Sequence, residues 1–306
     1  MRWIIIVISL FLCSCTQEGR SISIASYNCY AFFDSRDDGY EYEGFRYSDG
    51  YNEIRYGKRI DSYSRFLSRY IDADIIILEE VENSLVLVDL LEAGLRKRGY
   101  RYYGIADDRP LAVGFISRIR PSSVTIHSPQ SGRCILKLEF IVNGELLTVF
   151  ALHAKSRIGG GGEERRAMME YVHSLASLCE GAVIVAGDFN TDPESGEDAL
   201  SKSPGSAFPV TGDQGQVSGS VYYALSLDWE LDLGKGTYCY EGQWFFLDNI
   251  LAGRSLFDGA GMELAYGCVI DPEEAKDTLS RPRAYSVRTG IGYSDHFAIK
   301  AVLEYK

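Results

Sequence analysis

The chain lacks the patterns that mark several classes of protein. Its 306 residues contain no internal repeat and no heptad pattern, which excludes a repeat solenoid and a coiled coil. The apolar run near its start, from Ile4 to Leu12, spans nine residues, which is too short to cross a bilayer. Hydrophobic residues make up 46% and charged residues 24% of the chain, so it can bury a sizeable core and does not have the composition of a disordered protein.

Positive charge is also scarce. The 31 Lys and Arg residues are outnumbered by 43 Asp and Glu residues, and the net charge is -12. A protein that holds nucleic acid through its phosphate backbone usually presents a basic face, so tight non-specific binding of DNA is not expected. The acidity is compatible with a nuclease that binds weakly and turns over, above all one that uses a divalent cation.

Paired-cysteine motifs are absent as well. Two of the seven cysteines, Cys13 and Cys15, lie near the start of the chain. The other five form no CxxC motif and no zinc-binding spacing, and we expect most of them to be small buried hydrophobic side chains. A disulfide is an alternative in an exported protein, but the sequence does not say which of these cysteines would pair: Cys29, Cys134, Cys179, Cys239 and Cys268.

The first residues have the features of an export signal rather than of a folded element. A basic residue, Arg2, precedes the apolar run, whose length suits the core of a signal peptide. The following Leu12-Cys13-Ser14-Cys15 resembles a bacterial lipoprotein signal, with a leucine three residues before the cysteine that is acylated. An ordinary secretory signal or an uncleaved helix is the alternative. We predict a signal peptide at residues 1–14, a lipidated Cys15 with a tether through residue 20, one folded domain over residues 21–306, and an exported protein anchored to a bacterial membrane.

Strand and helix patterns alternate along the rest of the chain, with hairpins between some of them. Period-2 or continuous apolar runs predict strands, and apolar residues at helical spacing predict helices. Asn143-Gly144 is a strong hairpin signal, and Asn83 is an expected helix cap. Two polar, glycine-rich stretches, residues 34–52 and 194–220, are expected to be loops. The expected strands are 21–30, 73–81, 111–118, 134–141, 145–154, 182–190, 243–253 and 296–306, and the expected helices are 52–71, 83–100 and 163–179. This order favours an α/β (α+β) fold in which mixed sheets pack face to face with helices outside.

The stretch VIVAGDFNTDPES, residues 183–195, delivers two polar side chains at the end of an apolar run. Residues two apart in an extended segment point to the same side, so Asp188 and Asn190 are expected to project together at a strand end. The alternative is ordinary helix-cap chemistry before Pro193-Glu194.

The same arrangement recurs at other strand ends. Six such ends carry Asp, Glu, Asn or His, and if they converge they form an acidic pocket with two imidazoles. Hard oxygen ligands of this kind suit Mg²⁺ or Mn²⁺ rather than zinc. The residues are Asn28, Glu79, Glu80, His153, Asp188, Asn190, Asp248, Asp295 and His296.

These motifs resemble those of the endonuclease/exonuclease/phosphatase superfamily, whose members are similar to deoxyribonuclease I and exonuclease III. The matching pieces, in the family's order, are SYNCYAFFD, DIIILEEVEN, LHAKSR, GDFNTDP, LDNI and SDHFAI. Two more, FFDSRDDGYEYEGF with RYGKRI, and GTYCYEGQWFFLDNIL, are similar to a bacterial branch of it. The resemblance implies a deoxyribonuclease I-like four-layer sandwich of two mixed β-sheets flanked by helices.

The resemblance also implies roles for single residues. Glu80 matches the principal metal-binding carboxylate, with Asn28 and Asp295 supporting the metal site. Asp188 would activate the attacking water, and Asn190 would bind the scissile phosphate. Asp248 would orient His296. The two histidines, His296 and His153, would bind phosphate and move protons, and the resemblance does not say which of them is the acid and which the base.

Some positions depart from the family pattern or carry weaker signals. Asn249 stands where the family often has His, Gln or Arg, and His153 has no evident carboxylate partner, although Asp107 or Asp108 is a candidate. Arg109 and Lys155 are expected to bind substrate. Arg165 or Arg166, beside the glycine run at 159–162, is a further candidate for a substrate contact. Tyr40, Tyr42 and Tyr47 are candidate stacking surfaces for bases. His127 and His173 are expected to be structural.

The sequence therefore predicts a Mg²⁺- or Mn²⁺-dependent phosphodiesterase that acts outside the cytoplasm, with nucleic acid as the expected substrate. We infer no protein partner and expect a monomer. The first alternative keeps the chemistry but changes the substrate to a phospholipid, a sphingolipid or a phosphomonoester. The second is a binding lipoprotein without catalysis, against which the intact set of site residues argues. DNA against RNA, and endonucleolytic against exonucleolytic cutting, stay open.

Overall fold

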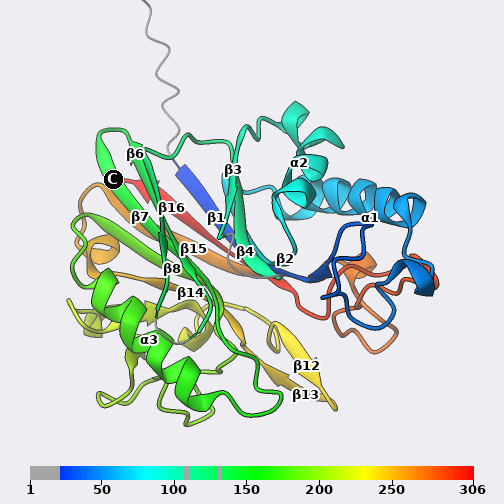
Figure 1. The fold of residues 1–306 in the computed structure, drawn as a ribbon. Coiled ribbons are helices and arrows are strands. Elements are labelled where there is room, and N and C mark those ends of the chain that lie inside the picture. Colours follow the sequence, from blue (N-terminus) through cyan, green and yellow to red (C-terminus); the bar gives the residue numbers. More distant parts are fainter. Residues whose placement is uncertain (1–20, 107–110, 130–131) are drawn as a thin grey trace, which may run out of the picture.

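Two mixed β-sheets form the centre of the computed structural model, which describes residues 21–106, 111–129 and 132–306 (Figure 1). The six-stranded sheet has the order β15-β16-β1-β2-β4-β3. Its strands are β1 (Ser21–Phe32), β2 (Ile75–Val81), β3 (Tyr102–Ile105), β4 (Ala112–Ser117), β15 (Met262–Ile270) and β16 (Ala298–Tyr305). The predicted signal peptide, Cys15 with its tether, and Arg109 with Asp107 and Asp108 lie outside the described residues.

The second sheet has eight strands in the order β5-β6-β7-β8-β14-β11-β10-β9. They are β5 (Ser123–His127), β6 (Ile135–Val142), β7 (Glu145–His153), β8 (Ala182–Asp188), β9 (Leu200–Ser201), β10 (Phe208–Thr211), β11 (Tyr222–Ala224) and β14 (Asp248–Ala252). A separate hairpin pairs β12 (Tyr238–Tyr240) with β13 (Gln243–Phe245) and projects from the body of the molecule (Figure 1).

Helices cover the outer faces of the sheets. Helices α1 (Glu53–Phe66) and α2 (Ser84–Glu92) lie on the six-stranded sheet, and α3 (Gly162–Ala176) lies on the other (Figure 1). Short 3-10 or π turns occur at 47–49, 67–71, 95–98, 214–216, 225–227, 254–257 and 273–275. None of the helices in the described part of the chain is long and apolar enough to span a membrane.

Alternation along the strands explains the layers. In β1, Ile22 and Ile24 enter the core between the sheets, whereas Tyr27 and Cys29 pack beneath the helices. In β7, Leu147, Val149 and Ala151 face the same inter-sheet core, whereas Phe150 and Leu152 pack under α3. Because both faces of these strands are buried, they are apolar at nearly every position. Three apolar cores between four layers confirm the predicted sandwich.

Local signals placed most element ends correctly. The Asn83 side chain accepts hydrogen bonds from the amides of Leu85 and Val86, so it caps α2 as expected. Asn143 and Gly144 both have positive φ angles, 50° and 87°, as a tight hairpin between β6 and β7 requires. The expected strand over 243–253 is instead divided, because its first part pairs with β12 and only its second part, β14, joins the sheet.

Several strands were not predicted. β15 is the longest of them, but it lies at a sheet edge, has exposed residues in its middle, and its register shifts between Leu264 and Tyr266. The others, β3, β5, β9, β10, β11 and β12, are five residues or shorter. Two of these short strands, β9 and β10, fall within the stretch 194–220 that we expected to be a loop. Within the described residues the cysteines form no disulfide.

Candidate active site

Three neighbouring strands of the eight-stranded sheet bring acids and a histidine to one edge. β7 and β8 are parallel and place His153 beside Asp188, and β14 is antiparallel and places Asp248 beside Asp188. All three positions are buried. The sequence therefore sets this row by ordinary strand pairing, because the residues occupy matching places at the strand ends.

Gly187 allows the strands to come this close. It pairs with Leu152 on β7, has a φ of 152°, and a Cβ atom built on it would lie 2.0 Å from the Leu152 carbonyl oxygen. A larger residue would push β8 from β7 and separate Asp188 from His153. This is the physical reason for glycine in the GDFN motif.

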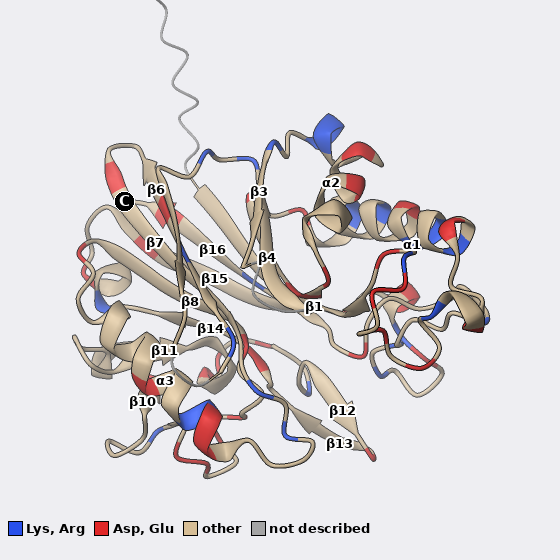
Figure 2. Cartoon of the chain, viewed as in Figure 1, with Lys and Arg blue, Asp and Glu red and all other residues tan. Residues whose placement is uncertain are grey.

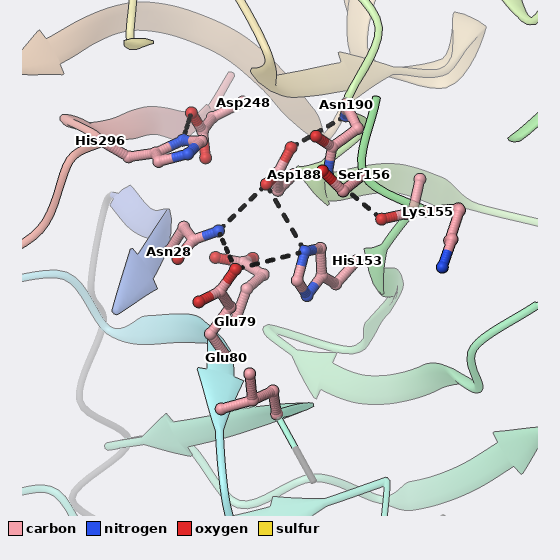
Figure 3. A network of polar contacts seen from close by, with 12 residues as sticks. Asn28, Glu79, Glu80, His153, Lys155, Ser156, Asp188, Asn190, Asp248 and His296 are labelled. Carbon is pink, nitrogen blue, oxygen red and sulfur yellow. Dashed lines mark hydrogen bonds and ion pairs between the residues drawn. The ribbon is translucent and has the colours of Figure 1, made fainter. Parts of the chain in front are cut away.

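The other half of the site comes from the ends of β1 and β2, which are irregular. The register of the β1–β2 pair shifts between Asn28 and Phe32, and that of the β2–β4 pair shifts between Leu78 and Val81. Within the second irregularity Glu80 has a φ of 59°, in the left-handed region. This turn points the Glu80 side chain toward Asn28 and the row of acids (Figure 3).

The two halves meet through Asn28. Its Nδ2 donates to Asp188 Oδ2 at 3.0 Å and to Glu80 Oε1 at 3.4 Å (Figure 3). Its Oδ1 accepts from the Tyr30 amide at 2.9 Å, so in this structure Asn28 presents its amino group to the carboxylates. Its contribution here is to hold the acids, and its predicted role as a metal ligand stays a prediction.

Asp188 lies at the centre of the cluster. Its Oδ1 accepts from the Asn190 amide at 2.8 Å, and its Oδ2 lies 3.6 Å from His153 Nε2. Burial, together with the nearby charge of Asp248, raises the pKa of Asp188 to about 7. A carboxyl group with this pKa suits a base that acts near neutral pH.

Asn190 joins Asp188 by a route other than the expected alternation. It has a φ of 48°, so the chain is no longer extended there, and its Nδ2 donates to the Ala154 carbonyl oxygen at 3.2 Å. The two side chains still lie side by side (Figure 3). The amide keeps one N–H to offer to a substrate.

His296 and Asp248 form a buried pair. His296 Nδ1 lies 2.7 Å from Asp248 Oδ2, and the buried Oδ1 of Asp248 has no hydrogen-bond partner among the described residues. Burial alone would lower the pKa of His296, but the carboxylate of Asp248 outweighs it and raises that pKa well above its usual value. Asp295, whose side chain is 36% exposed, lies 4.0 Å from His296 Nε2.

The loop before the hairpin holds this pair in place, which the sequence did not indicate. The Asp248 amide donates to Thr237 Oγ1 at 3.1 Å, and the Tyr238 ring lies against the His296 ring with 4.8 Å between their centroids. The β12–β13 hairpin is thus attached to the site at its base.

His153 has an environment opposite to that of His296. An Nη1 atom of Arg133 lies 3.0 Å from His153 Nε2 and also contacts Nδ1. Burial, then the positive charges of Arg133 and His296, lower the pKa of His153 well below its usual value. The Leu111 carbonyl opposes this shift through a hydrogen bond. The two shifts in pKa therefore favour a neutral His153 and a protonated His296.

Arg133 was missed by sequence reasoning, although a signal existed. The Asn143-Gly144 hairpin pairs β6 with β7 so that Leu136 faces Ala151. Extending this register by two residues brings the start of β6 to His153, and Arg133 is the next residue. The predicted substrate arginine, Arg109, lies outside the described residues, and Arg133 is the arginine that contacts His153 among the residues that the structure describes.

Other predicted contacts are placed as follows. Lys155 is exposed at the rim of the cluster (Figure 3). Arg165, which was weighed as a substrate contact, is buried and donates to the carbonyl oxygens of Lys155, Ser156 and Gly160. It therefore ties the glycine-rich loop to the start of α3. Asn249 is buried and donates to Ser226 Oγ, away from the acids, as expected for a supporting position.

Glu79, next to Glu80, has a different environment. It is fully buried and accepts from Ser26 Oγ at 2.6 Å. Burial, and then the charges of Asp248 and Asp188, raise its pKa well above the usual value. A neutral carboxyl group in this position is a poor cation ligand, which agrees with the choice of Glu80.

Two groups of side chains are possible places for a divalent cation. Asp188, Asp248 and His296 have ligand atoms within 4.8 Å of one another. However, the Asp248 carboxylate raises the pKa of His296 well above its usual value, and an imidazole protonated on both nitrogens cannot bind a metal. Glu80 faces solvent more openly, with 22% of its side chain exposed, and can bind Mg²⁺ that keeps several of its waters.

One family of known proteins matches the chain by sequence. Residues 23–305 match the sequence profile of the Endonuclease/Exonuclease/phosphatase family, whereas no curated protein matches the chain. Among solved structures, TDP2 from D. rerio with a single strand DNA product has a TM-score of 0.61 at 15% identity, and covers 94% of this chain and 100% of its own.

Two bacterial structures are also similar in fold. Sphingomyelinase C from Streptomyces griseocarneus has a TM-score of 0.57 at 14% identity, and covers 92% of this chain and 99% of its own. An endonuclease/exonuclease/phosphatase family protein from Bacteroides thetaiotaomicron has a TM-score of 0.57 at 17% identity, and covers 94% and 98%. With the profile match over nearly its whole described length, the chain belongs to the Endonuclease/Exonuclease/phosphatase family, a superfamily of phosphoric ester hydrolases that depend on divalent metals.

Proposed function

We propose that this chain is a phosphodiesterase that uses Mg²⁺ or Mn²⁺ to hydrolyse nucleic acid outside the cytoplasm. The observation that carries the proposal is the convergence of Glu80, Asp188 and the Asp248–His296 pair in one buried cluster. The site also holds one protonated and one neutral histidine, so it offers both a proton donor and an uncharged imidazole.

The donor set fits a hard cation. Glu80 Oε2 accepts from the Ala31 amide at 2.7 Å, whereas Glu80 Oε1 has longer contacts, 3.4 Å to Asn28 Nδ2 and 3.8 Å to His153 Nε2. Asp295 is close enough for the charge of Glu80 to raise its pKa. Carboxylate oxygens of this kind prefer Mg²⁺ or Mn²⁺. A cation held there by Glu80 and Asp295 would withdraw charge from the non-bridging oxygens of the phosphate.

The chain's own residues supply the remaining steps. Asp188, ionised through much of the neutral range, takes the proton of the attacking water. Imidazolium His296 donates from Nε2 to the phosphate, and Asp248 fixes its orientation through Nδ1. The free N–H of Asn190 and the Arg133 guanidinium supply further donors to the phosphate.

Two features favour nucleic acid over a lipid substrate. Tyr238 lies on His296, and Tyr42 is close enough to Glu80 and Arg133 for their charges to act on its pKa, which burial raises. Aromatic faces beside a phosphate site suit stacked bases. The tip of the projecting hairpin, Glu241-Gly242-Gln243, is exposed and polar, whereas a hairpin that enters a bilayer needs an apolar tip.

Charge places a limit on how the substrate is held. Lys and Arg are scattered over helices and loops rather than gathered on one face (Figure 2). Binding through an extended basic surface is therefore not part of the proposal, and affinity comes from the site itself. The D. rerio TDP2 structure, which contains a single strand DNA product, is consistent with a substrate of this class.

The experiment compares three substrates in parallel. The chain from Ser21 onward is incubated with supercoiled plasmid, single-stranded RNA or sphingomyelin, first with Mg²⁺ and then with EDTA. Glu80→Ala is the blank, and Glu53→Ala, on the exposed start of α1, is the matched control. Cleavage of plasmid or RNA that EDTA and Glu80→Ala abolish supports the proposal. Cleavage of sphingomyelin alone moves the chain to a lipid substrate, and cleavage that survives EDTA contradicts the metal dependence.

We also propose that Cys15 is acylated and anchors the protein to a bacterial membrane. The proposal rests on the Leu12-Cys13-Ser14-Cys15 pattern after a short apolar run. Expression of the full chain with a labelled fatty acid tests it. Incorporation of label that Cys15→Ser removes is the expected result, and unlabelled, freely soluble wild-type protein contradicts it.

A further inference from the structure

The buried arginine Arg59 stands on α1, behind the site. The residue is 1% exposed, and it forms no ion pair with a carboxylate among the described residues. The guanidinium lies over the rings of Phe32 and Tyr285, at 4.3 and 4.4 Å from their centroids. Burying a cation without an anion is unfavourable, so its other contacts have to offset the loss of water.

Those contacts are consecutive backbone carbonyl oxygens at the end of β1. Arg59 Nη2 donates to the carbonyls of Cys29 at 3.0 Å and Tyr30 at 2.6 Å, and Nη1 donates to that of Ala31 at 3.0 Å. The Tyr63 hydroxyl, also on α1, lies 2.8 Å from the carbonyl oxygens of both Cys29 and Tyr293, so its one proton is shared between these two acceptors. Helix α1 thus holds three adjoining peptide groups.

The same segment is strained. Tyr30 and Ala31 have φ angles of 53° and 46°, in the left-handed region that non-glycine residues rarely adopt. Such a conformation persists only where neighbouring contacts fix it. Arg59 supplies those contacts, because its planar group spans the carbonyls that the two residues turn inward.

The N–H groups at the opposite ends of two of these peptide groups fix the side chains of Glu80 and Asn28. The peptide whose carbonyl belongs to Tyr30 carries the Ala31 N–H, which donates to Glu80 Oε2 at 2.7 Å. The peptide before it carries the Tyr30 N–H, which donates to Asn28 Oδ1 at 2.9 Å. The C=O and N–H of a trans peptide point in opposite directions, so each group links Arg59 on one side to a site residue on the other.

We propose that Arg59 is a positioning residue that sets the affinity of the site for its divalent cation. It acts through two peptide groups, which it orients and polarises, on Glu80 and Asn28. The inference rests on the proposed function, because it concerns the same cation. Residues that orient a metal ligand commonly change metal affinity by about 10- to 100-fold when they are altered.

The experiment measures binding of Mn²⁺ alone, without substrate, by calorimetric titration of the metal-free chain from Ser21. Arg59→Lys keeps the charge but cannot span three carbonyls. Its matched control is Arg55→Lys, one turn earlier on α1, whose side chain contacts the Val287 carbonyl instead. We expect the Mn²⁺ Kd of Arg59→Lys to rise by about tenfold or more, and that of Arg55→Lys to stay at the wild-type value.

A second variant covers the case in which Arg59→Lys does not fold. Tyr63→Phe removes the hydroxyl that lies between the Cys29 and Tyr293 carbonyls and buries no charge, and we expect a smaller rise in Kd, about threefold, since at most one bond to the strand end is lost. Folded variants that bind Mn²⁺ as the wild type does, even with a lower Tm, overturn the inference alone. A wild-type chain that binds no Mn²⁺ overturns the proposed function as well.

Discussion

The two sheets build their halves of the site in different ways. The eight-stranded sheet presents His153, Asp188 and Asp248 from regular strands whose residues are paired in register. The six-stranded sheet presents Asn28 and Glu80 from strand ends whose register is broken and whose backbone enters the left-handed region. The regular half is fixed by strand pairing, and the irregular half by hydrogen bonds to a buried helix side chain.

This difference separates two tasks. Proton transfer depends on groups held at constant distances, and a regular ladder supplies these at no conformational cost. A metal ligand has to turn out of the sheet toward solvent, and a strand can do this only by a bulge. We therefore expect changes in the regular half to affect turnover or folding, and changes in the irregular half to affect metal binding.

The largest expected effect follows from Asp188→Asn. An amide cannot take a proton from water, so turnover of the cleaved substrate should fall by about 10³-fold or more. His296→Ala should have an effect of similar size, because it removes the proton donor. Both are measured at saturating Mg²⁺ together with Tm, with His173→Ala, whose ring contacts the Ser220 carbonyl, as control. Normal turnover in either folded variant would remove these residues from the chemistry.

A second change tests the close pairing of β7 and β8. Gly187→Ala places a Cβ atom 2.0 Å from the Leu152 carbonyl oxygen, so the strands have to separate. We expect the free energy of unfolding in urea to fall by about 2–4 kcal/mol. Gly57→Ala is the matched control, because its Cβ meets no atom within 4 Å in the middle of α1, and it should raise stability by up to about 1 kcal/mol. Equal effects of the two changes would contradict the role of Gly187.

The smallest expected effect separates Glu79 from Glu80. Burial raises the pKa of folded Glu79 above its unfolded value, so the folded state holds the proton more tightly and loses stability as pH rises. Glu79→Gln needs no proton and should stabilise the protein by about 1 kcal/mol at pH 8, and by less at pH 5. Urea unfolding at both pH values measures this. The same gain at both would show that Glu79 is ionised in the folded state.

Sequence reasoning reached the regular half more fully than the irregular one. Motif order and strand ends named His153, Asp188 and Asp248 in the sequence, and regular strand pairing brings these three residues together in the structure. The twist of Glu80 away from Glu79 depends on backbone angles that no local pattern encodes. The family resemblance, rather than spacing, chose between these two adjacent acids.

Contacts between distant segments account for what was missed. Arg59, on a helix, reaches Asn28 through the peptide group between Cys29 and Tyr30 at a strand end. Tyr238 packs on His296, which is distant in the sequence. β15 was overlooked because an edge strand with one exposed face and a register shift has no clear period. In each case the residue is ordinary in its own segment, and its importance comes from a partner elsewhere in the chain.

The direction of β1 determines which way the reactive edge faces. The strand begins at Ser21 and reaches Asn28 after about 23 Å, at roughly 3.3 Å per residue, so the amino end and the site lie at opposite ends of the sheet. The proposed tether of residues 15–20 extends at most about 20 Å. A lipid on Cys15 would therefore turn the site away from its own membrane. In that orientation the site would meet molecules that arrive from the surrounding fluid, and not the lipids of its own membrane.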